Sequence, residues 1–430
     1  MVAGLDMEMA GDAYRKHLQT LIEQGQLSEA LINTSVSHIL RIKFRLGLFD
    51  NPYTDPADLP PVADRQALTV AREAALQSAV LLKNERQVLP LDAGSLQSVA
   101  VIGPLADEAY EQLGTWIFDG DPRLSVTVLE GIERTIGDQA EVRYQKVLET
   151  SRSRSDEAFA EAEALAASSD AAILVLGEES ILSGEAHCRA DINLPGAQAE
   201  LVARIRHSGT PVIAVVLAGR PLTLTNIIDQ VDALLFAWHP GTMGGVAIAD
   251  LLFGNASPSG KLPVSFPRHV GQVPIHYNRK NTGKPPTPDS VIHIDDIDAN
   301  APQTSLGMTA FHLDAGYQPL FPFGFGLSYT DFSYANLRCS KSELPLGETL
   351  EVAVELTNVG SRAAEEVVQL YIRDLVGSVT RPVKELKDFQ RVAVEPGQTV
   401  TVQFALTPDK LAFYGRSQQL GIEPGRFRVW

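Results

Sequence analysis

Short apolar runs that alternate with amphipathic stretches dominate the middle of the chain. The apolar runs are SVAVIG (98–103), AAILVLG (171–177), PVIAVVL (211–217) and DALLFAW (232–238). Apolar residues recur at helical spacing in the stretches 155–168, 195–208 and 242–254. Strands that are apolar on both faces are typical of a parallel sheet covered by helices on each side. We therefore predict an α/β sandwich domain over residues 65–265.

Single residues predict where two of these helices begin. Ser155, followed by two acidic residues, favours a helix N-terminus. Pro195 is typical of a first helical turn. We therefore expect helices to begin near these two residues.

The N-terminal residues 1–64 follow a different pattern. Apolar residues recur at helical spacing up to residue 50, and Ser28 is a candidate N-cap. Residues 51–64 are rich in Pro and Asp and have the composition of a linker. Because two helices without a sheet cannot form a domain, we predict that this segment is the tail of a larger domain.

The C-terminal part changes to a period of two. Apolar and polar residues alternate between residues 331 and 430, with NVGS and EPGQ as turn signals, which predicts an antiparallel β-sandwich. The last residues, FRVW, resemble the middle of a strand, so we expect this domain to be truncated at its end. Residues 266–330 are rich in Pro, Gly, Asn and Asp and predict a long irregular connection.

Charge and cysteine content narrow the function. The chain has 430 residues and a net charge of −17, which argues against nucleic acid or an anionic membrane as a partner but leaves a neutral sugar possible. Its two cysteines give neither a disulfide framework nor a zinc spacing, and no metal or other cofactor is expected. No run of eighteen apolar residues predicts a membrane span, and the first residues do not resemble a secretory signal peptide.

The candidate chemistry lies in residues 177–195, GEESILSGEAHCRADINLP, which begin where an apolar run ends. In a parallel α/β sheet, ligands bind at the carboxyl ends of strands. Glu185 follows a flexible glycine, and Arg189, four residues later, could orient it or balance its charge. One such carboxylate suggests a general acid/base, which needs a partner. A solvated acidic loop without chemistry is the alternative.

Other residues of this segment have weaker interpretations. Glu178 and Glu179 either contact a ligand or pair locally, and Asp191 is better explained by capping or bracing of the loop. His187 is a candidate titratable group, but a lone loop histidine is usually structural or exposed. Cys188 would need a setting that stabilises its thiolate, and nothing else in the sequence suggests a cysteine enzyme.

Two further features outside this segment leave alternatives open. The glycines of HPGTMGG (239–245) either cradle an anion or allow close packing of the next helix. Trp116 either lines a sugar platform or fills the edge of a core. Neither the GxGxxG nor the GxxxxGK[ST] fingerprint occurs at a strand end, which argues against a dinucleotide or nucleotide site.

Nine blocks in order along the chain closely resemble glycoside hydrolase family 3 of the β-glucosidase type, most of all its bacterial periplasmic β-glucosidases. The blocks are AGLDMEM (3–9), KFRLGLFDNPY (43–53), SAVLLKNERQVLPL (78–91), VAVIGPLAD (99–107), LGEESILSGEAHCRADINLPGAQ (176–198), GRPLTL (219–224), AWHPGTMGGVAIADLLFGNASPSGKLPVSFP (237–267), PLFPFGFGLSYTDF (319–332) and RPVKELKDFQRV (381–392).

This resemblance implies an architecture and a mechanism. Family members combine a TIM-like barrel, an α/β sandwich and often a fibronectin type III-like domain, and they retain the anomeric configuration. An Asp of the barrel attacks the sugar, and a Glu of the α/β sandwich acts as acid and then base. The family motif places that Glu at Glu185 and a supporting basic residue, expected to bind substrate, at Arg189. Residues 1–64 would be a helical remnant of the barrel domain with its linker, and residues 331–430 the fibronectin type III-like domain.

The chain also departs from the family pattern. The Ser-Asp-Trp motif of the nucleophile precedes the block matched by AGLDMEM in relatives, and it does not occur in this sequence. Met243 stands where relatives commonly carry Glu. We therefore expect the C-terminal portion of a periplasmic or secreted β-glucosidase that needs no cofactor, acts on β-glucosides or oligosaccharides, and alone has little or no activity. The alternative is a non-catalytic carbohydrate-binding or interaction protein that reuses the family's C-terminal domains.

Overall fold

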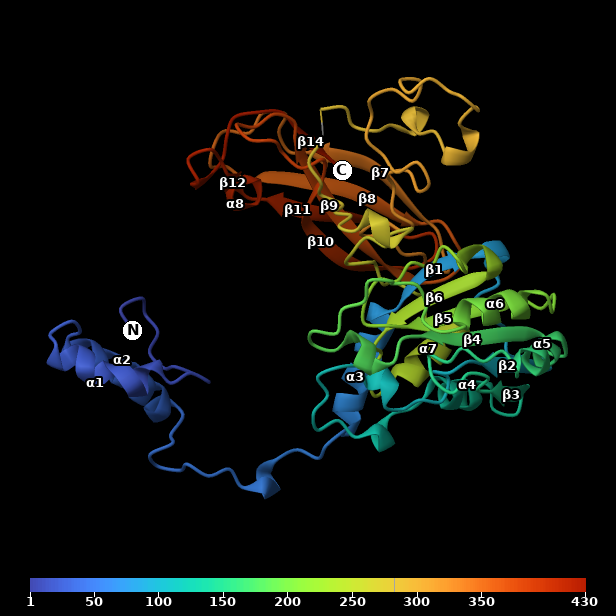
Figure 1. Ribbon diagram of the computed structural model, residues 1–430, viewed down its shortest axis with the longest axis horizontal. Coiled ribbons are helices and arrows are strands. Elements are labelled where there is room, and N and C mark those ends of the chain that lie inside the picture. The colour runs from blue at the N-terminus through green and yellow to red at the C-terminus, as the bar shows by residue number, and fades with distance from the viewer. Residues whose placement is uncertain (282) are drawn as a thin grey trace. The chain divides into compact units, whose positions relative to one another are not determined.

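The computed structural model describes residues 1–281 and 283–430, which divide into two compact units, Met1–Asp64 and Arg65–Trp430 (Figure 1). The first unit contains the helices α1 (Ala13–Glu23) and α2 (Glu29–Arg45). The predicted N-cap is confirmed, because the Ser28 side chain accepts a hydrogen bond from the backbone N–H of Ala30 at 3.2 Å.

The two N-terminal helices bury almost nothing. Ser35 is the one buried residue of either helix. Large apolar side chains of α2 are instead exposed, among them Ile42 at 52% and Phe44 at 67%. The apolar periodicity of these helices therefore does not serve a core within this unit.

A six-stranded sheet forms the centre of the α/β part of the second unit, residues 65–265 (Figure 1). Its strand order is β1-β6-β5-β4-β2-β3. The strands are β1 (Val80–Asn84), β2 (Ser98–Ile102), β3 (Glu141–Gln145), β4 (Ala171–Gly177), β5 (Val212–Leu217) and β6 (Ala233–Trp238). All pairs are parallel except β1 with β6. The four apolar runs are the four inner strands, while the two edge strands were not recognised in the sequence.

Helices cover both faces of this sheet. One face packs against α5 (Phe159–Ala167) and α6 (Gln198–Arg206). The other face packs against α3 (Arg65–Ser78), α4 (Val128–Ile136) and α7 (Gly244–Leu252). The predicted α/β sandwich is thereby confirmed. The α5 and α6 helices begin later than expected. Ser155 and Pro195 lie in irregular backbone, and the turns 157–158 and 196–197 precede the first helical residues.

The glycines of HPGTMGG allow two helices to pack closely. A Cβ atom on Gly245 would lie 1.8 Å from the carbonyl oxygen of Thr127, the N-cap residue of α4. A Cβ atom on Gly131, within α4, would lie 2.1 Å from the carbonyl oxygen of Gly245. Close packing therefore accounts for Gly245, and an anion cradle is not needed to explain it.

The C-terminal strands form a β-sandwich, as predicted. One sheet has the order β11-β8-β7 and the other β10-β9-β14. The strands are β7 (Phe332–Cys339), β8 (Leu350–Asn358), β9 (Ala364–Asp374), β10 (Glu385–Val394), β11 (Thr399–Leu406) and β14 (Phe427–Val429). Buried and half-buried residues alternate along the whole of β9, so one face of this strand points into the core between the sheets.

Shorter elements complete the second unit. They are the helix α8 (Pro408–Leu411) and the strand pair β12 (Phe413–Tyr414) and β13 (Leu420–Gly421). Residues 266–330 contain isolated bridges and three short 3-10 helices, Val270–Gln272, Pro288–Ser290 and Ile294–Asp296. Across residues 1–281 and 283–430, no helix has both the length and the apolar character needed to cross a membrane.

The contact between α4 and α7 predicts a strong effect of a single methyl group. We expect Gly245→Ala to lower the free energy of unfolding by about 3 kcal/mol, because backbone must move to make room for the new Cβ atom. Urea denaturation followed by circular dichroism measures this change. Gly271→Ala is the matched control, since no atom lies within 4 Å of its added Cβ. Equal stability of the two variants would contradict the packing argument.

Candidate active site

The acidic segment leaves the sheet at the carboxyl end of β4, where a glycine permits close contact with the next strand. Gly177 has a φ of 139°, and a Cβ atom there would lie 1.7 Å from the carbonyl oxygen of Leu217 in β5. Its backbone N–H also donates to the Gln198 side chain at 2.8 Å. The strand end is therefore rigidly held, and the residues that follow begin from a fixed position.

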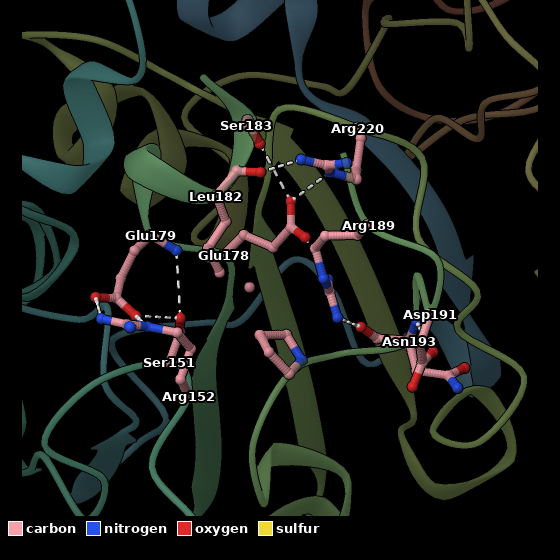
Figure 2. Close-up of polar contacts among 12 residues, drawn as sticks. Ser151, Arg152, Glu178, Glu179, Leu182, Ser183, Arg189, Asp191, Asn193 and Arg220 are labelled. Atoms are coloured by element: carbon pink, nitrogen blue, oxygen red, sulfur yellow. Dashed lines mark hydrogen bonds and ion pairs between the residues drawn. The ribbon is translucent and has the colours of Figure 1, made fainter. Parts of the chain in front are cut away.

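Glu178 is the buried centre of the segment. Its side chain has 0% exposure and accepts hydrogen bonds from three groups (Figure 2). Arg189 Nη1 binds one carboxylate oxygen, while Arg220 Nε at 3.0 Å and Ser183 Oγ at 3.2 Å bind the other. A buried carboxylate is tolerated only when it is paired in this way. Glu178 therefore pairs locally, which was one of its two predicted roles.

The two arginines carry this anchor into the loop (Figure 2). Arg220, which lies after β5, donates to the carbonyl oxygens of Leu182 and His187, the latter at 3.0 Å. Arg189 donates to the carbonyl oxygen of Asn193 at 2.9 Å. Residues 182–193 are thus attached to one buried carboxylate at several points.

Glu179 makes a second ion pair beside the first (Figure 2). Arg152 Nε and Nη2 donate to its two oxygens at 2.9 Å each, and Ser151 Oγ donates at 2.7 Å. The Arg152 guanidinium holds the pKa of the Glu179 carboxyl below its usual value, although burial opposes this effect. Glu179 is therefore an ionised carboxylate whose two oxygens are both engaged in structural contacts.

Glu185 lies differently from its neighbours. It is exposed, and within the described chain its side chain has no hydrogen bond or ion pair. Arg189 pairs with Glu178 instead, so the proposed support of Glu185 by a direct contact with Arg189 is not found. The next residue, Ala186, has a φ of 63°, which turns the chain at this point.

The remaining polar side chains of the segment, Asp191, His187 and Cys188, have different surroundings. Asp191 Oδ1 accepts a hydrogen bond from the backbone N–H of Asn193 at 2.9 Å, which braces the loop (Figure 2). His187 bonds through Nδ1 to the carbonyl oxygen of Ile181. Cys188 is a free, exposed thiol. Of the four carboxylates, Glu185 alone is unengaged among the residues that the structure describes.

An aromatic loop is tied to the acidic segment. Glu111 Oε2 accepts a hydrogen bond from the backbone N–H of Ser180 at 2.6 Å. Five residues further on, Trp116 is 61% exposed, and its ring lies 5.7 Å from that of Phe118, which is 83% exposed. Trp116 therefore does not fill the edge of a core, and the two rings form an exposed aromatic surface on the loop that contacts the acidic segment.

His239, directly after β6, is half-buried where several loops meet, and both of its ring nitrogens are buried. A Cβ atom on Gly114 would lie 2.6 Å from its Cγ, and one on Gly219 would lie 2.5 Å from its Nε2 and 2.7 Å from the Cβ of Ser183. Neither ring nitrogen has a hydrogen-bond partner among the described residues. Burial lowers the pKa of this imidazole from its usual 6.5, with a smaller opposing effect of Glu178.

Sequence reasoning missed four residues of this arrangement: Ser151, Arg152, Arg220 and His239. Two of them had a usable signal, because Arg220 and His239 follow apolar runs that were predicted as parallel strands. Ser151 and Arg152 lie in a loop with no such signal. Their roles are seen only in their contacts with Glu179, which lies 28 positions from Ser151 and 27 from Arg152.

Comparison with known proteins defines the class. Residues 79–329 match the model of the glycosyl hydrolase family 3 C-terminal domain, and residues 366–430 match the fibronectin type III-like domain. The chain therefore belongs to glycoside hydrolase family 3, and within that family it is similar to β-glucosidases and β-xylosidases.

Particular relatives support this assignment over the whole chain. A periplasmic beta-glucosidase of Salmonella typhimurium is 37% identical and a beta-xylosidase of Formosa agariphila 36% identical, each over 100% of this chain. The structure of a Listeria innocua beta-glucosidase mutant in complex with laminaribiose has a TM-score of 0.88 and 36% identity over 99% of the chain. The chain spans 57% of each of the two curated relatives and 56% of the Listeria protein.

The same substitution is expected to have different effects on stability at Glu178 and at Glu185. Glu178→Gln should lower the free energy of unfolding by about 3 kcal/mol, because it leaves two arginines without their carboxylate. Glu185→Gln, as the matched control, should leave stability unchanged, since the exposed side chain has no partner to lose. Urea denaturation and the rate of proteolysis within residues 177–195 measure both effects. A stable, protease-resistant Glu178→Gln variant would contradict the assigned anchor.

His239 predicts a loss of stability in mild acid. Because the folded state lowers the pKa of this imidazole, the unfolded chain takes up the proton first as pH falls below about 6.5. The contribution is therefore fully present above that pH and decreases below it, by at most about 1.4 kcal/mol per pH unit. We expect His239→Leu to flatten the dependence of unfolding free energy on pH between 6.5 and 5, whereas substitution of the exposed His207 should not. An unchanged slope in His239→Leu would argue against this origin.

Proposed function

We propose that the chain supplies the acid/base half of a retaining β-glucosidase active site, with Glu185 as the general acid/base. The supporting observation is that the carboxylates of residues 177–195 differ in whether they have a partner. Three of the four carboxylates are engaged in ion pairs or hydrogen bonds, and Glu185 is exposed and unengaged. A residue that exchanges protons with a substrate must be accessible, whereas its neighbours hold the loop.

In this mechanism Glu185 first donates a proton to the glycosidic oxygen as the bond to the anomeric carbon breaks. An Asp nucleophile forms the covalent glycosyl-enzyme on the opposite face of the sugar. Glu185, now ionised, then takes a proton from the water that attacks this intermediate, so that the configuration is retained. The two carboxyl groups of retaining enzymes lie about 5–5.5 Å apart. We propose that the nucleophile belongs to a barrel domain outside the printed sequence.

Arg189 enters this proposal as a supporting residue. Its two Nη atoms donate to Glu178 and to the carbonyl oxygen of Asn193. These bonds use two of the five N–H groups of the guanidinium, so further donors remain for a substrate hydroxyl. Arg189 therefore fixes the loop that carries Glu185 and can in addition bind substrate, as the family resemblance implies.

The aromatic pair Trp116 and Phe118 is suited to the leaving-group side of a β-glucoside. Exposed aromatic faces bind the apolar faces of sugar rings and aryl groups. The hydrogen bond between Glu111 and Ser180 keeps this pair near the acid/base loop. Substrates are terminal β-glucosyl residues of glucosides or oligosaccharides, and the relative named as periplasmic supports a periplasmic location.

The division of the chain follows the same proposal. Residues 1–64 are the helical end of the barrel domain with a linker, and the exposed apolar face of α2 is suited to packing against that barrel. Residues 65–265 carry the acid/base loop, residues 266–330 are a connection, and residues 331–430 are the fibronectin type III-like domain.

A fusion tests this proposal directly. The purified chain should not hydrolyse aryl β-glucosides, because it holds half of the carboxylate pair. The same chain joined to the N-terminal barrel of the Salmonella relative should hydrolyse them. In this fusion Glu185→Gln should slow the hydrolysis of phenyl β-glucoside, which releases the poor leaving group phenol, by about 10²–10⁴-fold. A substrate with a good leaving group should be affected less, and azide should restore turnover by forming the β-glucosyl azide.

Controls separate the assignments. Glu161→Gln changes an exposed carboxylate of α5 and should leave turnover at the level of the unmodified fusion. An active fusion in which Glu185→Gln has no effect would remove Glu185 from the acid/base role. Hydrolysis by the chain alone, abolished by Glu185→Gln, would instead show that both carboxylates lie within it. A folded fusion that binds β-glucosides without turnover would favour the non-catalytic alternative.

A further inference from the structure

A cavity lies outside the acidic segment, between the irregular connection and the β9 strand. Its volume is about 630 Å³, within the range of pockets that hold small ligands. No residue of the segment 177–195 lines it. Its lining comes from Ser265 and from several residues between 275 and 279 and between 318 and 325 on one side. The other side is formed by β9, by Tyr334 at the start of β7, and by Val383 and Lys384, which directly precede β10.

Aromatic rings form much of the wall. Tyr277 stacks on Phe323 with ring centroids 4.1 Å apart and an interplanar angle of 11°. The ring of Tyr371 lies 6.2 Å from that of Tyr277 and nearly perpendicular to it, at 76°. Burial raises the pKa of Tyr371 to about 12, so its ring carries a neutral hydroxyl group. A wall of this kind is suited to the apolar face of a sugar ring.

Two cationic residues, Arg279 and Lys384, line this cavity from neighbouring backbone segments. The backbone N–H of Val383 donates to the carbonyl oxygen of Arg279 at 2.9 Å, so the segment around Arg279 runs beside the one that carries Lys384. Lys384 Nζ lies 4.7 Å from the centroid of Tyr371. In the part of the chain that the structure describes, neither cation has an ion pair. Their contacts are with aromatic rings instead, since Arg279 Cζ lies 5.7 Å from the centroid of Tyr317 and Lys384 Nζ lies 5.2 Å from that of Trp430. Two cations without an ion pair are unexpected in a protein with 53 acidic and 36 basic residues.

The one acidic residue of the cavity wall is already neutralised. Glu366 Oε2 lies 3.0 Å from Lys261 Nζ, and its Oε1 accepts a hydrogen bond from the Tyr334 hydroxyl at 3.0 Å. Both groups of this ion pair are largely buried, with side-chain exposures of 13% and 11%. The net charge at the wall is therefore positive, from Arg279 and Lys384.

Hydroxyl groups supply further hydrogen-bonding capacity. Ser265 is only 6% exposed and lines the cavity, and its hydroxyl has no partner within residues 1–281 and 283–430. The Tyr277 oxygen accepts a hydrogen bond from the backbone N–H of Leu386 at 3.2 Å, which leaves its own proton free to be donated. Both hydroxyls can therefore donate a hydrogen bond to a ligand that enters the cavity.

We propose that this cavity binds a carboxylated sugar, a uronate unit of a saccharide, at a site separate from the acid/base loop. The sugar ring packs on the aromatic wall, and its carboxylate lies between Arg279 and Lys384. The hydroxyls of Ser265 and Tyr277 bind the ring hydroxyls. The site gives the protein a means of holding an acidic polysaccharide or oligosaccharide while a neutral glucosyl unit is processed elsewhere.

Titration calorimetry with a matched ligand pair tests the proposal. Methyl β-D-glucuronide and methyl β-D-glucoside differ only in the carboxylate at carbon 6. The full chain should bind the glucuronide with a Kd on the order of 1 mM and the glucoside at least tenfold more weakly. Added salt should weaken glucuronide binding, because the attraction is partly between charges. Equal binding of the two ligands, or equally strong binding of acetate alone, would overturn the proposal.

Variants locate the site. Arg279→Gln and Lys384→Gln should each weaken glucuronide binding at least fivefold, and the double variant should abolish it with an unchanged melting temperature. Arg154→Gln, an exposed arginine outside the cavity, is the control and should bind as the unmodified chain does. Glu185→Gln should also bind normally, which separates this site from the proposed active site. Loss of binding in Glu185→Gln, or retention in the double variant, would contradict the assigned location.

Discussion

The buried carboxylate of Glu178 is the constraint on which the path of the acidic segment, residues 177–195, depends. A charged group with no solvent contact must be neutralised by its surroundings. Arg189 and Arg220 do this from two different loops, and each also donates to backbone carbonyl groups of residues 182–193. The requirement to satisfy one carboxylate therefore fixes the path of the loop. Glu185, which lies on this fixed loop, is exposed and unpaired among the described residues.

The parallel sheet explains why these groups meet. The carboxyl ends of β2, β4, β5 and β6 lie at the same edge, so the loops that follow them converge there. His239 is packed at this point between Gly114 and Gly219, beside Ser183. Glycine is needed at positions 114 and 219, since a methyl group at either one would collide with the His239 ring. A neutral imidazole with buried ring nitrogens thus fills the space among these loops, and the sheet topology is what brings it there.

The sequence predicts the inner strands well and the edge strands poorly. β4, β5 and β6 are buried on both faces, so their apolar runs are continuous. β3, in contrast, is an edge strand of exposed and half-buried residues, EVRYQ, whose pattern resembles a loop. The β-sandwich was also predictable, because its strands alternate with a period of two along their length. What sequence periodicity reports is burial, and β3 has too little of it.

The site was predictable in its position but not in its pairing. The spacing of Arg189 from Glu185 suggested a direct contact, but residues four apart face each other only in a helix, and this loop is not helical beyond Ser183. The actual partner, Glu178, is eleven positions away, and Arg220 reaches it from 42 positions away. Contacts of this range depend on which strands are neighbours. The same limit applies to Arg279 and Lys384, which are far apart in sequence and adjacent in the fold.

The account rests on Glu185 facing a nucleophile supplied from outside the printed sequence. A crystal structure of the barrel fusion, trapped with a 2-deoxy-2-fluoro β-glucoside, tests this most directly. The account predicts a glucosyl group covalently bound to an Asp of the barrel, with a Glu185 carboxyl oxygen about 5–5.5 Å from that carboxylate. A glucosyl group on a residue of this chain, or another carboxylate in the place predicted for Glu185, would contradict it.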